Sequence, residues 1–459
     1  MIDDLKPYAE YKDSGLPWLG QVPGHWEVRR AKFLLREVDS RSATGKEQLL
    51  RVSQYTGVTP RKAVEGSDAP DTRASSLVGY KRVNADDIVI NIMLAWNGSI
   101  GVSRYDGIAS PAYCVYRFNQ DALPWYFHEV LRAPAYKQRI KAASTGVVES
   151  RLRLYSDDLG RIELPLPPPT EQAAIVRFLD WANGRLERAI RAKRKVISLL
   201  GEQKQAITHR AVTRGLDPSV PLKPSGIPWL GDIPPHWEAR RIKYLLREVD
   251  ERSTTGSEPL LSMRMHHGLV LFSEHFTRPP QAATLVGFKI VRPGQFVVNR
   301  MQAGNGVIFA SVLTGLVSPD YAVFDPIGDA NIDFLGELFR SRKVRAKFRA
   351  ESKGLGTGTS GFLRLYNDRL GAIHVALPPH EEQGTILEGL ARELSGVNAA
   401  ISRLEREIEL LREYRTRLVA DVVTGKLDVR EAAARLPDEA PLEIAIPPDE
   451  EGLESEATE

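Results

Sequence analysis

Two long segments of the chain carry apolar residues at helical spacing. Between 380 and 427 these residues recur every three or four positions, which is typical of a helix that pairs with another helix. The segment 169–214 has a weaker apolar stripe, because Lys193 and Lys204 interrupt it. Each stripe needs an apolar cover, so we expect the two helices to pack antiparallel as a coiled coil. The predicted seam residues are Leu186, Ile190, Ile197, Leu200, Ile207, Val397, Ile401, Leu404, Ile408, Leu411 and Leu418.

Both predicted helices begin and end with the same signals. Leu-Pro-Pro precedes each helix and Glu-Gln lies in its first turn, within 166–172 and 377–383. Proline stops the preceding element, and acidic side chains are favoured at a helix N-terminus. At the other end, Gly215 and Gly425 can adopt the left-handed conformation that closes a helix.

The rest of the chain is an internal repeat. The segment 14–20, Ser-Gly-Leu-Pro-Trp-Leu-Gly, returns 211 positions later at 225–231 with one residue changed. Across the longer match that begins there, about 26 of 37 aligned positions are identical, which is far beyond chance. Each half of the chain therefore begins with the same globular unit.

The globular units are predicted to be mixed α/β. Segments 87–92 and 295–299 have the composition of strands, 123–141 and 332–349 are helical, and Asn-Gly at 97–98 and 305–306 marks turns. The predicted domains are a first unit (1–168), a first helix (169–214), a second unit (215–379), a second helix (380–427) and a C-terminal tail (428–459).

The distribution of charge favours an anionic partner. The end of the chain, 438–459, holds nine acidic residues and no Lys or Arg, and we expect it to be disordered. Without it the formal charge rises from +3 to about +12, because nine carboxylates are removed. A basic body of this kind is typical of a protein that binds nucleic acid.

Nothing in the sequence indicates export or insertion into a membrane. Cys114 is the single cysteine, which excludes a disulfide framework and fits a reducing cytoplasm. The N-terminus lacks the apolar core of a signal peptide, and the longest apolar run, 307–317, is too short to span a bilayer. We therefore expect a cytoplasmic protein.

The repeated layout suits binding along a DNA duplex. The two halves of the chain differ in the segments that would contact the bases. Helices of about 42 residues are about 63 Å long, so an antiparallel pair would hold two units at a fixed spacing along a duplex. The segment 54–76 has little in common with 263–284, and the hairpin 93–106 diverges from 301–314. These differences predict an asymmetric bipartite target, although unconstrained surface loops would diverge in the same way.

These features together resemble one protein family. Four features resemble type I restriction-modification specificity subunits: the Pro-Trp-Leu-Gly and Pro-x-His-Trp opening of each half, the strand at 107–113, the Leu-Pro-Pro-x-x-Glu-Gln start of a long helix and the closing Thr-Gly-Lys-Leu-Asp. The resemblance extends to about Arg435 and involves order, duplication and spacing. The acidic tail has no place in the family pattern.

The resemblance implies a non-catalytic subunit whose two target-recognition domains read double-stranded DNA. It implies that the paired helices dock two modification subunits, which methylate adenine N6 with S-adenosylmethionine. Motor-nuclease restriction subunits would complete the enzyme. The chain itself would bind no cofactor, since S-adenosylmethionine, ATP and Mg belong to the partner subunits.

Catalytic motifs are absent from the sequence. The methyltransferase motif that holds a flipped adenine is missing, and the glycine-rich string 354–358 lacks the Lys-Ser/Thr of a phosphate loop. Asp320 with 351–353 matches only the loosest nuclease pattern, and the first half has no equivalent. His25 and His236 are expected to have structural roles beside a tryptophan, and no metal site is predicted.

Candidate DNA contacts come from the divergent segments. Base edges are read by Arg, Lys, Asn and Gln side chains, and any cation can contact a phosphate. The base-reading candidates are Gln54, Tyr55, Arg61, Lys62, Trp96 and Asn97 in the first unit and Arg264, His266, His267, Arg300, Gln302 and Asn305 in the second. The phosphate candidates are Arg104, Lys141, Arg151, Lys353 and Arg364.

Two other functions remain as alternatives to a DNA-specificity module. One is a self-contained nuclease or methyltransferase, which turnover by the purified chain would reveal. The other is a coiled-coil scaffold with no role in nucleic-acid binding, which would bind random and specific duplexes equally well.

Overall fold

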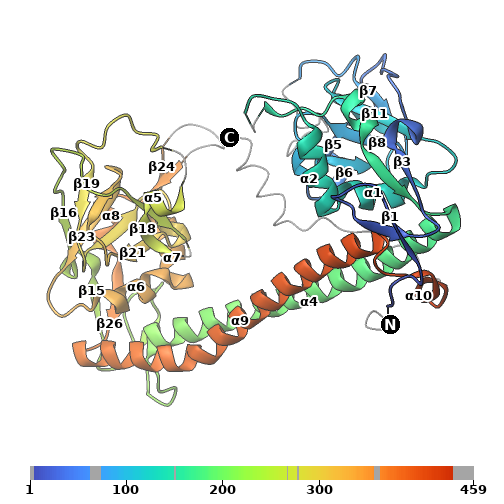
Figure 1. Ribbon diagram of the computed structural model, residues 1–459. Coiled ribbons are helices and arrows are strands. Elements are labelled where there is room, and N and C mark those ends of the chain that lie inside the picture. The colour runs from blue at the N-terminus through green and yellow to red at the C-terminus, as the bar shows by residue number, and fades with distance from the viewer. Residues whose placement is uncertain are drawn as a thin grey trace. The chain divides into compact units, whose positions relative to one another are not determined.

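The computed structural model describes residues 5–61, 74–148, 151–265, 267–276, 279–355 and 362–437. The chain divides into two compact units (Figure 1). Unit 1 consists of Met1–Lys193 and Arg406–Glu459, and unit 2 is the continuous segment Arg194–Glu405. None of the helices in the described part of the chain is long and apolar enough to cross a membrane.

Unit 1 is built from short strands, short helices and parts of the two long helices. Its elements are β1 (Tyr11–Asp13), β2 (Gln21–Pro23), β3 (Glu27–Arg30), η1 (Ala31–Phe33), β4 (Leu35–Glu37), β5 (Leu50–Ser53), β6 (Gly57–Pro60), β7 (Lys81–Val83), β8 (Ile88–Asn91), η2 (Ala95–Asn97), β9 (Ile100–Val102), β10 (Gly107–Ala109), β11 (Tyr113–Phe118), α1 (Pro124–Arg132), α2 (Pro134–Ala143), α3 (Ser156–Arg161), β12 (Glu163–Leu166) and the first part of α4 (Pro169–Arg214). The last part of α9 and α10 (Arg430–Ala434) complete it.

Unit 2 begins with the last part of α4 and repeats this order, with α5, β24 and β25 as additional elements among the described residues. Its elements are β13 (Lys223–Pro224), β14 (Asp232–Ile233), β15 (Glu238–Arg241), η4 (Ile242–Tyr244), β16 (Leu246–Val249), β17 (Leu261–Arg264), β18 (Gly268–Leu271), α5 (Phe272–His275), β19 (Lys289–Val291), β20 (Phe296–Asn299), η5 (Ala303–Asn305), β21 (Ile308–Ala310), β22 (Gly315–Val317), β23 (Tyr321–Pro326), α6 (Ile332–Arg340), α7 (Arg342–Glu351), β24 (Lys353–Leu355), β25 (Phe362–Arg364), α8 (Asn367–Ala372), β26 (His374–Leu377) and the first part of α9 (His380–Val423).

The two units share one sheet topology. The central antiparallel sheet has the order β4-β11-β8-β9 in unit 1 and β16-β23-β20-β21 in unit 2. A separate pair, β12-β3 or β15-β26, lies just before each long helix and ties it to the start of its own unit. The mixed α/β units joined by two long helices confirm the fold class expected from the sequence.

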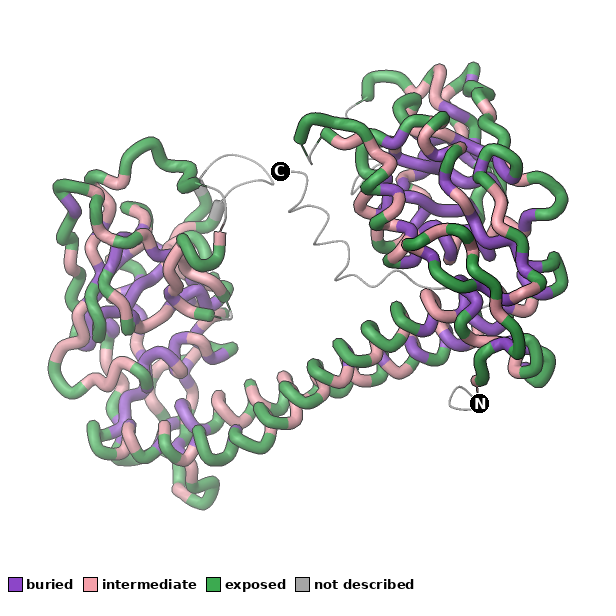
Figure 2. The backbone as a smooth tube through the Cα atoms, in the orientation of Figure 1, coloured by how far each residue is buried: buried purple, intermediate pink, exposed green. Residues whose placement is uncertain are grey.

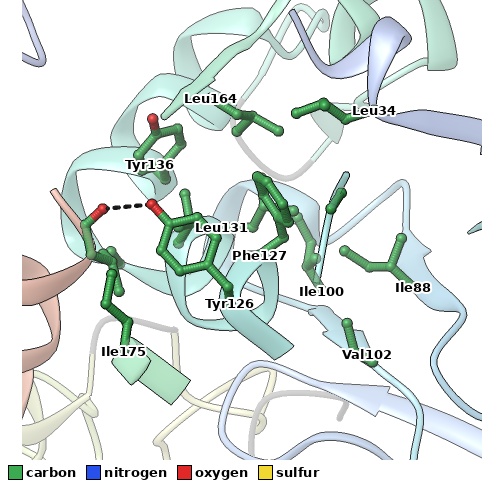
Figure 3. Packing of buried hydrophobic residues seen from close by; sticks show 14 of the residues in the cluster. Leu34, Ile88, Ile100, Val102, Tyr126, Phe127, Leu131, Tyr136, Leu164 and Ile175 are labelled. Atoms are coloured by element: carbon green, nitrogen blue, oxygen red, sulfur yellow. Dashed lines mark hydrogen bonds between the residues drawn. The ribbon is translucent and has the colours of Figure 1, made fainter. Parts of the chain in front are cut away.

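Aromatic and aliphatic side chains fill the core of unit 1. Tyr126, Phe127 and Leu131 of α1 lie against Ile88 and Ile100 of the sheet, and all five are essentially inaccessible (Figure 3). The hydroxyl of Tyr126 donates a hydrogen bond of 3.1 Å to the carbonyl oxygen at the end of α9. The last turn of α9 therefore belongs to this core, although it lies almost 300 residues away in the sequence.

Segments of the two long helices pair antiparallel within each unit. In unit 1 the Lys193 ammonium lies 2.6 Å from the Glu407 carboxylate, and Glu187 and Arg415 lie 3.6 Å apart. In unit 2 the Arg210 guanidinium lies 3.0 Å from Glu393. Residues later in α4 thus contact residues earlier in α9, as expected for an antiparallel pair.

The seam between these helices is thin in its middle part. Leu186, Ile190, Ile408 and Leu418 are buried, and the other seven predicted seam residues are partly buried. Residues 191–210 of α4, all of them described, include no buried side chain, and Figure 2 shows this stretch as pink and green. Lys193 and Lys204 fit here because their ammonium groups reach Glu407 and, at 2.8 Å, the Asn398 amide oxygen.

Two expected helices are each broken in two. The predicted helix 123–141 is α1 followed by α2, and Ala133 between them is extended at φ −64° and ψ 147°. Pro134 accounts for this break, because a residue before proline is disfavoured in the helical region. The predicted helix 332–349 is likewise α6 and α7, with Ser341 extended at the same point without a proline. The turn glycines Gly215 and Gly425 have φ of 83° and 78°, as expected for helix closure.

The first turn of each long helix is fixed to its unit by a buried glutamine. Gln172 is fully buried; its side-chain oxygen accepts a hydrogen bond from the Leu123 amide at 2.7 Å, and its amide donates to the carbonyls of Asp121 and Pro167. Gln383 makes the same three contacts, with the Asn331 amide and with the carbonyls of Asp329 and Pro378.

The glutamate that precedes each buried glutamine accepts hydrogen bonds from several side chains. The Glu171 carboxylate accepts hydrogen bonds from the Tyr8 hydroxyl at 2.6 Å and the Trp26 indole at 2.9 Å, and lies 2.7 Å from His25 Nε2. Glu382 accepts from the Trp237 indole at 3.1 Å and lies 2.8 Å from His236 Nε2. Burial and the Glu171 carboxylate raise the pKa of Tyr8, so its hydroxyl stays protonated as a donor.

Replacing Gln172 by alanine should destabilise unit 1. The substitution leaves one buried amide and two carbonyl groups without their partner, so we expect a loss of about 2–4 kcal/mol in the free energy of unfolding. Differential scanning calorimetry should resolve the shift, with Gln203→Ala on the exposed surface of α4 as the control. Equal melting curves for the two variants would contradict the role assigned to Gln172.

Candidate nucleic-acid interface

Four of the six base-reading candidates of unit 1 come together at one edge of the unit. Gln54 and Tyr55 lie at the turn between β5 and β6, and Trp96 and Asn97 end the short helix η2. The Trp96 indole donates to the Met93 carbonyl at 3.1 Å, and Asn97 accepts from the Ser99 hydroxyl at 3.0 Å. Arg61 is exposed just after β6.

One arginine, which the sequence analysis missed, joins these two segments. The Arg132 guanidinium at the end of α1 donates to the carbonyls of Ser53, Gln54 and Tyr55 at 3.3, 3.0 and 2.9 Å. The same group donates to the carbonyls of Gly98 and Ile100 at 3.2 and 2.7 Å. Because backbone carbonyls take all of these bonds, Arg132 positions the β5–β6 turn beside the turn after η2. Its sequence context, one arginine among many at a helix end, gave no signal of this role.

His128, one turn earlier on α1, packs beneath the same surface. The Val102 amide donates to His128 Nδ1 at 3.1 Å, so this nitrogen is an acceptor. Burial lowers the pKa of His128 well below its usual value, and the neighbouring charges of Arg132 and Arg104 act in the same direction. A Cβ added at Gly57, whose φ is +70°, would lie 3.1 Å from the imidazole. The neutral ring therefore supports the β5–β6 hairpin directly.

Two phosphate candidates of unit 1 lie over aromatic rings, one of which belongs to this edge. The Arg104 guanidinium stacks 4.0 Å from the Trp125 ring centre, and the Lys141 ammonium lies 5.6 Å from that of Trp96. Arg151 and Met93 line an open cleft of about 880 Å³. Lys141 thereby joins the phosphate candidates to the base-reading candidate Trp96.

The candidates of unit 2 fall into two groups. Arg264 and His267 lie on the β17–β18 hairpin, where the Arg264 guanidinium lies 5.3 Å from the Phe276 ring centre and His267 lies 5.8 Å from the ring of His275. Gln302 and Asn305 are exposed at η5, and their side chains are 3.1 Å apart.

Several cations of unit 2 are engaged by carboxylates. The Arg300 guanidinium donates to Glu248 at 2.9 Å, and Arg364 donates to Asp320 at 3.3 Å. Lys353 is exposed on β24, where it pairs in register with Arg364 of β25. Asp320 therefore neutralises an arginine, and no group of three or more His, Cys, Asp or Glu in the described ranges could hold a metal ion.

The two units hold their reading edges differently. Arg340 of α6 occupies the place of Arg132, but it donates to only one carbonyl, that of Ile308, at 3.3 Å and otherwise to Glu337. Arg349 of α7 instead donates to the Asn305 side chain at 3.0 Å and to the Gly304 carbonyl. The predicted contacts Lys62 and His266, and the acidic tail from 438, lie outside the described residues.

Removing the Arg132 guanidinium should loosen the reading edge of unit 1. In Arg132→Ala the carbonyls at 53–55 and 98–100 lose a shared charged donor, so we expect amide exchange of these two segments to rise at least tenfold, about 1.4 kcal/mol. Hydrogen-exchange mass spectrometry measures this directly. Arg340→Ala is the matched control and should leave both segments unchanged; equal exchange in the two variants would contradict the assignment.

Acidification should destabilise unit 1 through His128. The pKa of the folded state lies below the unfolded value near 6.5, so only the unfolded state takes up a proton as the pH falls below about 6.5. We expect up to about 1.4 kcal/mol of stability to be lost for each further pH unit until the folded pKa is reached. Thermal melts of the parent and of His128→Gln between pH 7.5 and 5.5 isolate this contribution, and parallel pH profiles would refute it.

Comparison with known proteins gives a consistent result. No protein-family model matches the chain. A sequence of Methanocaldococcus jannaschii assigned as the specificity subunit of the type I restriction enzyme MjaX is 22% identical over 455 residues, covering 90% of this chain and 96% of the relative.

One solved structure agrees at the level of fold. A chain from a structure on complex assembly and conformational transition of the type I R-M system aligns at a TM-score of 0.61 and 16% identity, over 88% of this chain and 99% of that one. The HsdS subunit from Thermoanaerobacter tengcongensis covers 88% of this chain and 98% of its own at 16% identity, but its TM-score of 0.42 is too low to establish a shared fold. Sequence and fold together confirm that the chain resembles the specificity subunits of type I restriction-modification systems over nearly its whole length.

Proposed function

We propose that this chain is the DNA-reading specificity subunit of a type I restriction-modification complex. In this proposal it reads an asymmetric bipartite double-stranded target in the cytoplasm. It docks two adenine-N6 methyltransferase subunits and the restriction subunits. The observation that carries the proposal is that two units with one scaffold present unlike side chains at the same edge of the fold.

The contrast between scaffold and edge supports two unlike half-sites. The buried Trp26 and Trp237 and the glutamines at 172 and 383 occupy matching positions with matching contacts. At the reading edge, the β5–β6 hairpin of unit 1 carries the Gln54 amide and the β17–β18 hairpin of unit 2 carries the Arg264 guanidinium, whereas Asn97 and Asn305 match. Amide and guanidinium groups pair with different base edges in the major groove, so the two units would select different bases.

In this proposal, cations supply affinity without sequence information. Lys141 lies beside Trp96 at the edge of unit 1, Arg104 stacks on Trp125 in the first turn of α1, and Lys353 is exposed on β24 of unit 2. Phosphate contacts of this kind make binding weaken steeply as the salt concentration rises. The expected excess of positive charge in the chain outside its acidic tail acts in the same direction.

In this proposal the chemical steps take place on the partner subunits. The methyl group comes from S-adenosylmethionine bound to the modification subunit, and ATP and Mg act on the restriction subunit. The chain determines which adenine is methylated, because the reading edges of its two units bind the complex to one DNA sequence.

Methylome sequencing tests the bipartite target. Cells that carry the chain and its modification subunit should show methyladenine in a single two-part motif. Gln54→Ala with Asn97→Ala should relax one half of the motif by about 10–100-fold in discrimination, and Gln302→Ala with Asn305→Ala should relax the other half.

A phosphate-contact variant provides the control. Arg104→Ala should weaken binding to every duplex and reduce the salt dependence by about one counterion, while the motif stays unchanged. Relaxation of both halves by the unit 1 variant, or methylation or cleavage by the purified chain alone, would overturn the proposal.

A further inference from the structure

An exposed aromatic side chain occupies the same place in both units. Phe33 closes η1 and is 62% exposed, and Tyr244 closes η4 and is 56% exposed. In each unit the preceding lysine places its ammonium 5.0 Å from the ring centre. We call this the Lys-aromatic surface, and its exposed members are Arg30, Lys32, Phe33, Arg36 and Asp157 in unit 1 and Arg241, Lys243, Tyr244, Arg247 and Asp368 in unit 2.

A rigid backbone presents this side chain in both units. The residue before each short helix has nearly the same torsions, φ −67° and ψ 140° in unit 1 and φ −73° and ψ 141° in unit 2. The Ala31 amide donates to the Ile162 carbonyl at 2.8 Å, and the Ile242 amide donates to Ile373 at 2.9 Å.

The adjacent short helix packs closely against the lysine. A Cβ added at Gly160 of α3 would lie 3.3 Å from the Cβ of Lys32, and one added at Gly371 of α8 would lie 3.2 Å from that of Lys243. These glycines let the short helix approach, so the exposure of the aromatic ring results from a well-packed scaffold.

Retention of this surface in both units indicates one ligand that is bound twice. Exposure of a large aromatic ring to water is unfavourable in free energy. Such rings are enriched in protein interfaces, where they fill pockets on a partner. The reading edges differ between the units, whereas the Lys-aromatic surface keeps its residue types and its exposure. The acidic C-terminal segment of this chain exists once and could cover only one of the two surfaces.

The position and charge of the surface favour a protein over DNA. In unit 1, β3, which leads into η1, lies on the side away from β5, β6 and α2, which carry the reading edge (Figure 1). Arg30 lies 4.0 Å from Glu163, and Arg247 donates to Asp325 at 3.2 Å. The lysine beside each ring is therefore the cation that fits a partner face with acidic groups around an apolar pocket.

We propose that the Lys-aromatic surface docks the modification subunit, one copy on each unit, in addition to the contacts that the resemblance implies for the paired helices. The inference rests on the proposed function, since that function requires two copies of one partner. The ring of Phe33 or Tyr244 enters an apolar pocket of the partner, and Lys32 or Lys243 pairs with carboxylates at its rim.

Stoichiometry provides the test. Native mass spectrometry and titration of the full chain with the purified modification subunit should give two partners on the parent chain and one on Phe33→Ser or Tyr244→Ser alone. In the double variant, affinity should fall at least about tenfold at both sites. Lys32→Glu with Lys243→Glu should weaken binding in the same way if the partner face is acidic.

Matched controls separate the possible outcomes. Val78→Ser with Val286→Ser removes two exposed apolar side chains, 57% and 52% exposed, and should leave two partners bound. Binding of two partners by the aromatic double variant at unchanged affinity, or a selective loss of duplex binding by that variant without partner, would overturn the inference. Failure of the parent chain to bind the modification subunit would instead count against the proposed function.

Discussion

The attachment of each long helix to its unit depends on one buried pair of side chains in the first helical turn. The glutamine satisfies three backbone groups around the preceding prolines, and the glutamate gathers the indole and imidazole of the opening segment. These bonds fix the orientation of the first helical turn on its unit. The apolar stripe of the helix is therefore aimed by contacts inside the globular unit as much as by the partner helix. The stretch 191–210 of α4, which has no buried residue, can therefore keep its apolar face towards α9.

The regular features were predictable because they repeat. The long helices, their closing glycines, the two similar units and the structural role of the histidines beside the tryptophans all follow from periodicity and from the duplicated motifs. The break between α1 and α2 was also readable in principle, because Pro134 excludes a continuous helix. The matching break at Ser341 was not, since no proline follows Ser341 in the sequence.

The candidate interface was predictable only in outline. Side chains with base-reading chemistry could be selected from divergent segments, but the residues that hold those segments could not. Arg132 and Arg340 are matching arginines at matching helix ends, yet one binds five carbonyls and the other mainly a glutamate. Such a difference depends on the loops that approach the guanidinium, which no spacing in the sequence reveals. The roles of Lys193 and Lys204, which interrupt the seam, were equally hidden in the sequence, because their partners lie on the opposite helix.

The two units can fold at different stages of synthesis. Unit 2 is a continuous segment, whereas the core of unit 1 includes Leu418, Val422 and Val429, and the Asp428 amide donates to the Lys6 carbonyl at 2.8 Å. A nascent chain can thus complete the second unit while the first still lacks part of its interior. Unit 1 closes only after the ribosome has released the final helix. A truncated product would expose the unfilled apolar interior of unit 1, which distinguishes it from the finished protein.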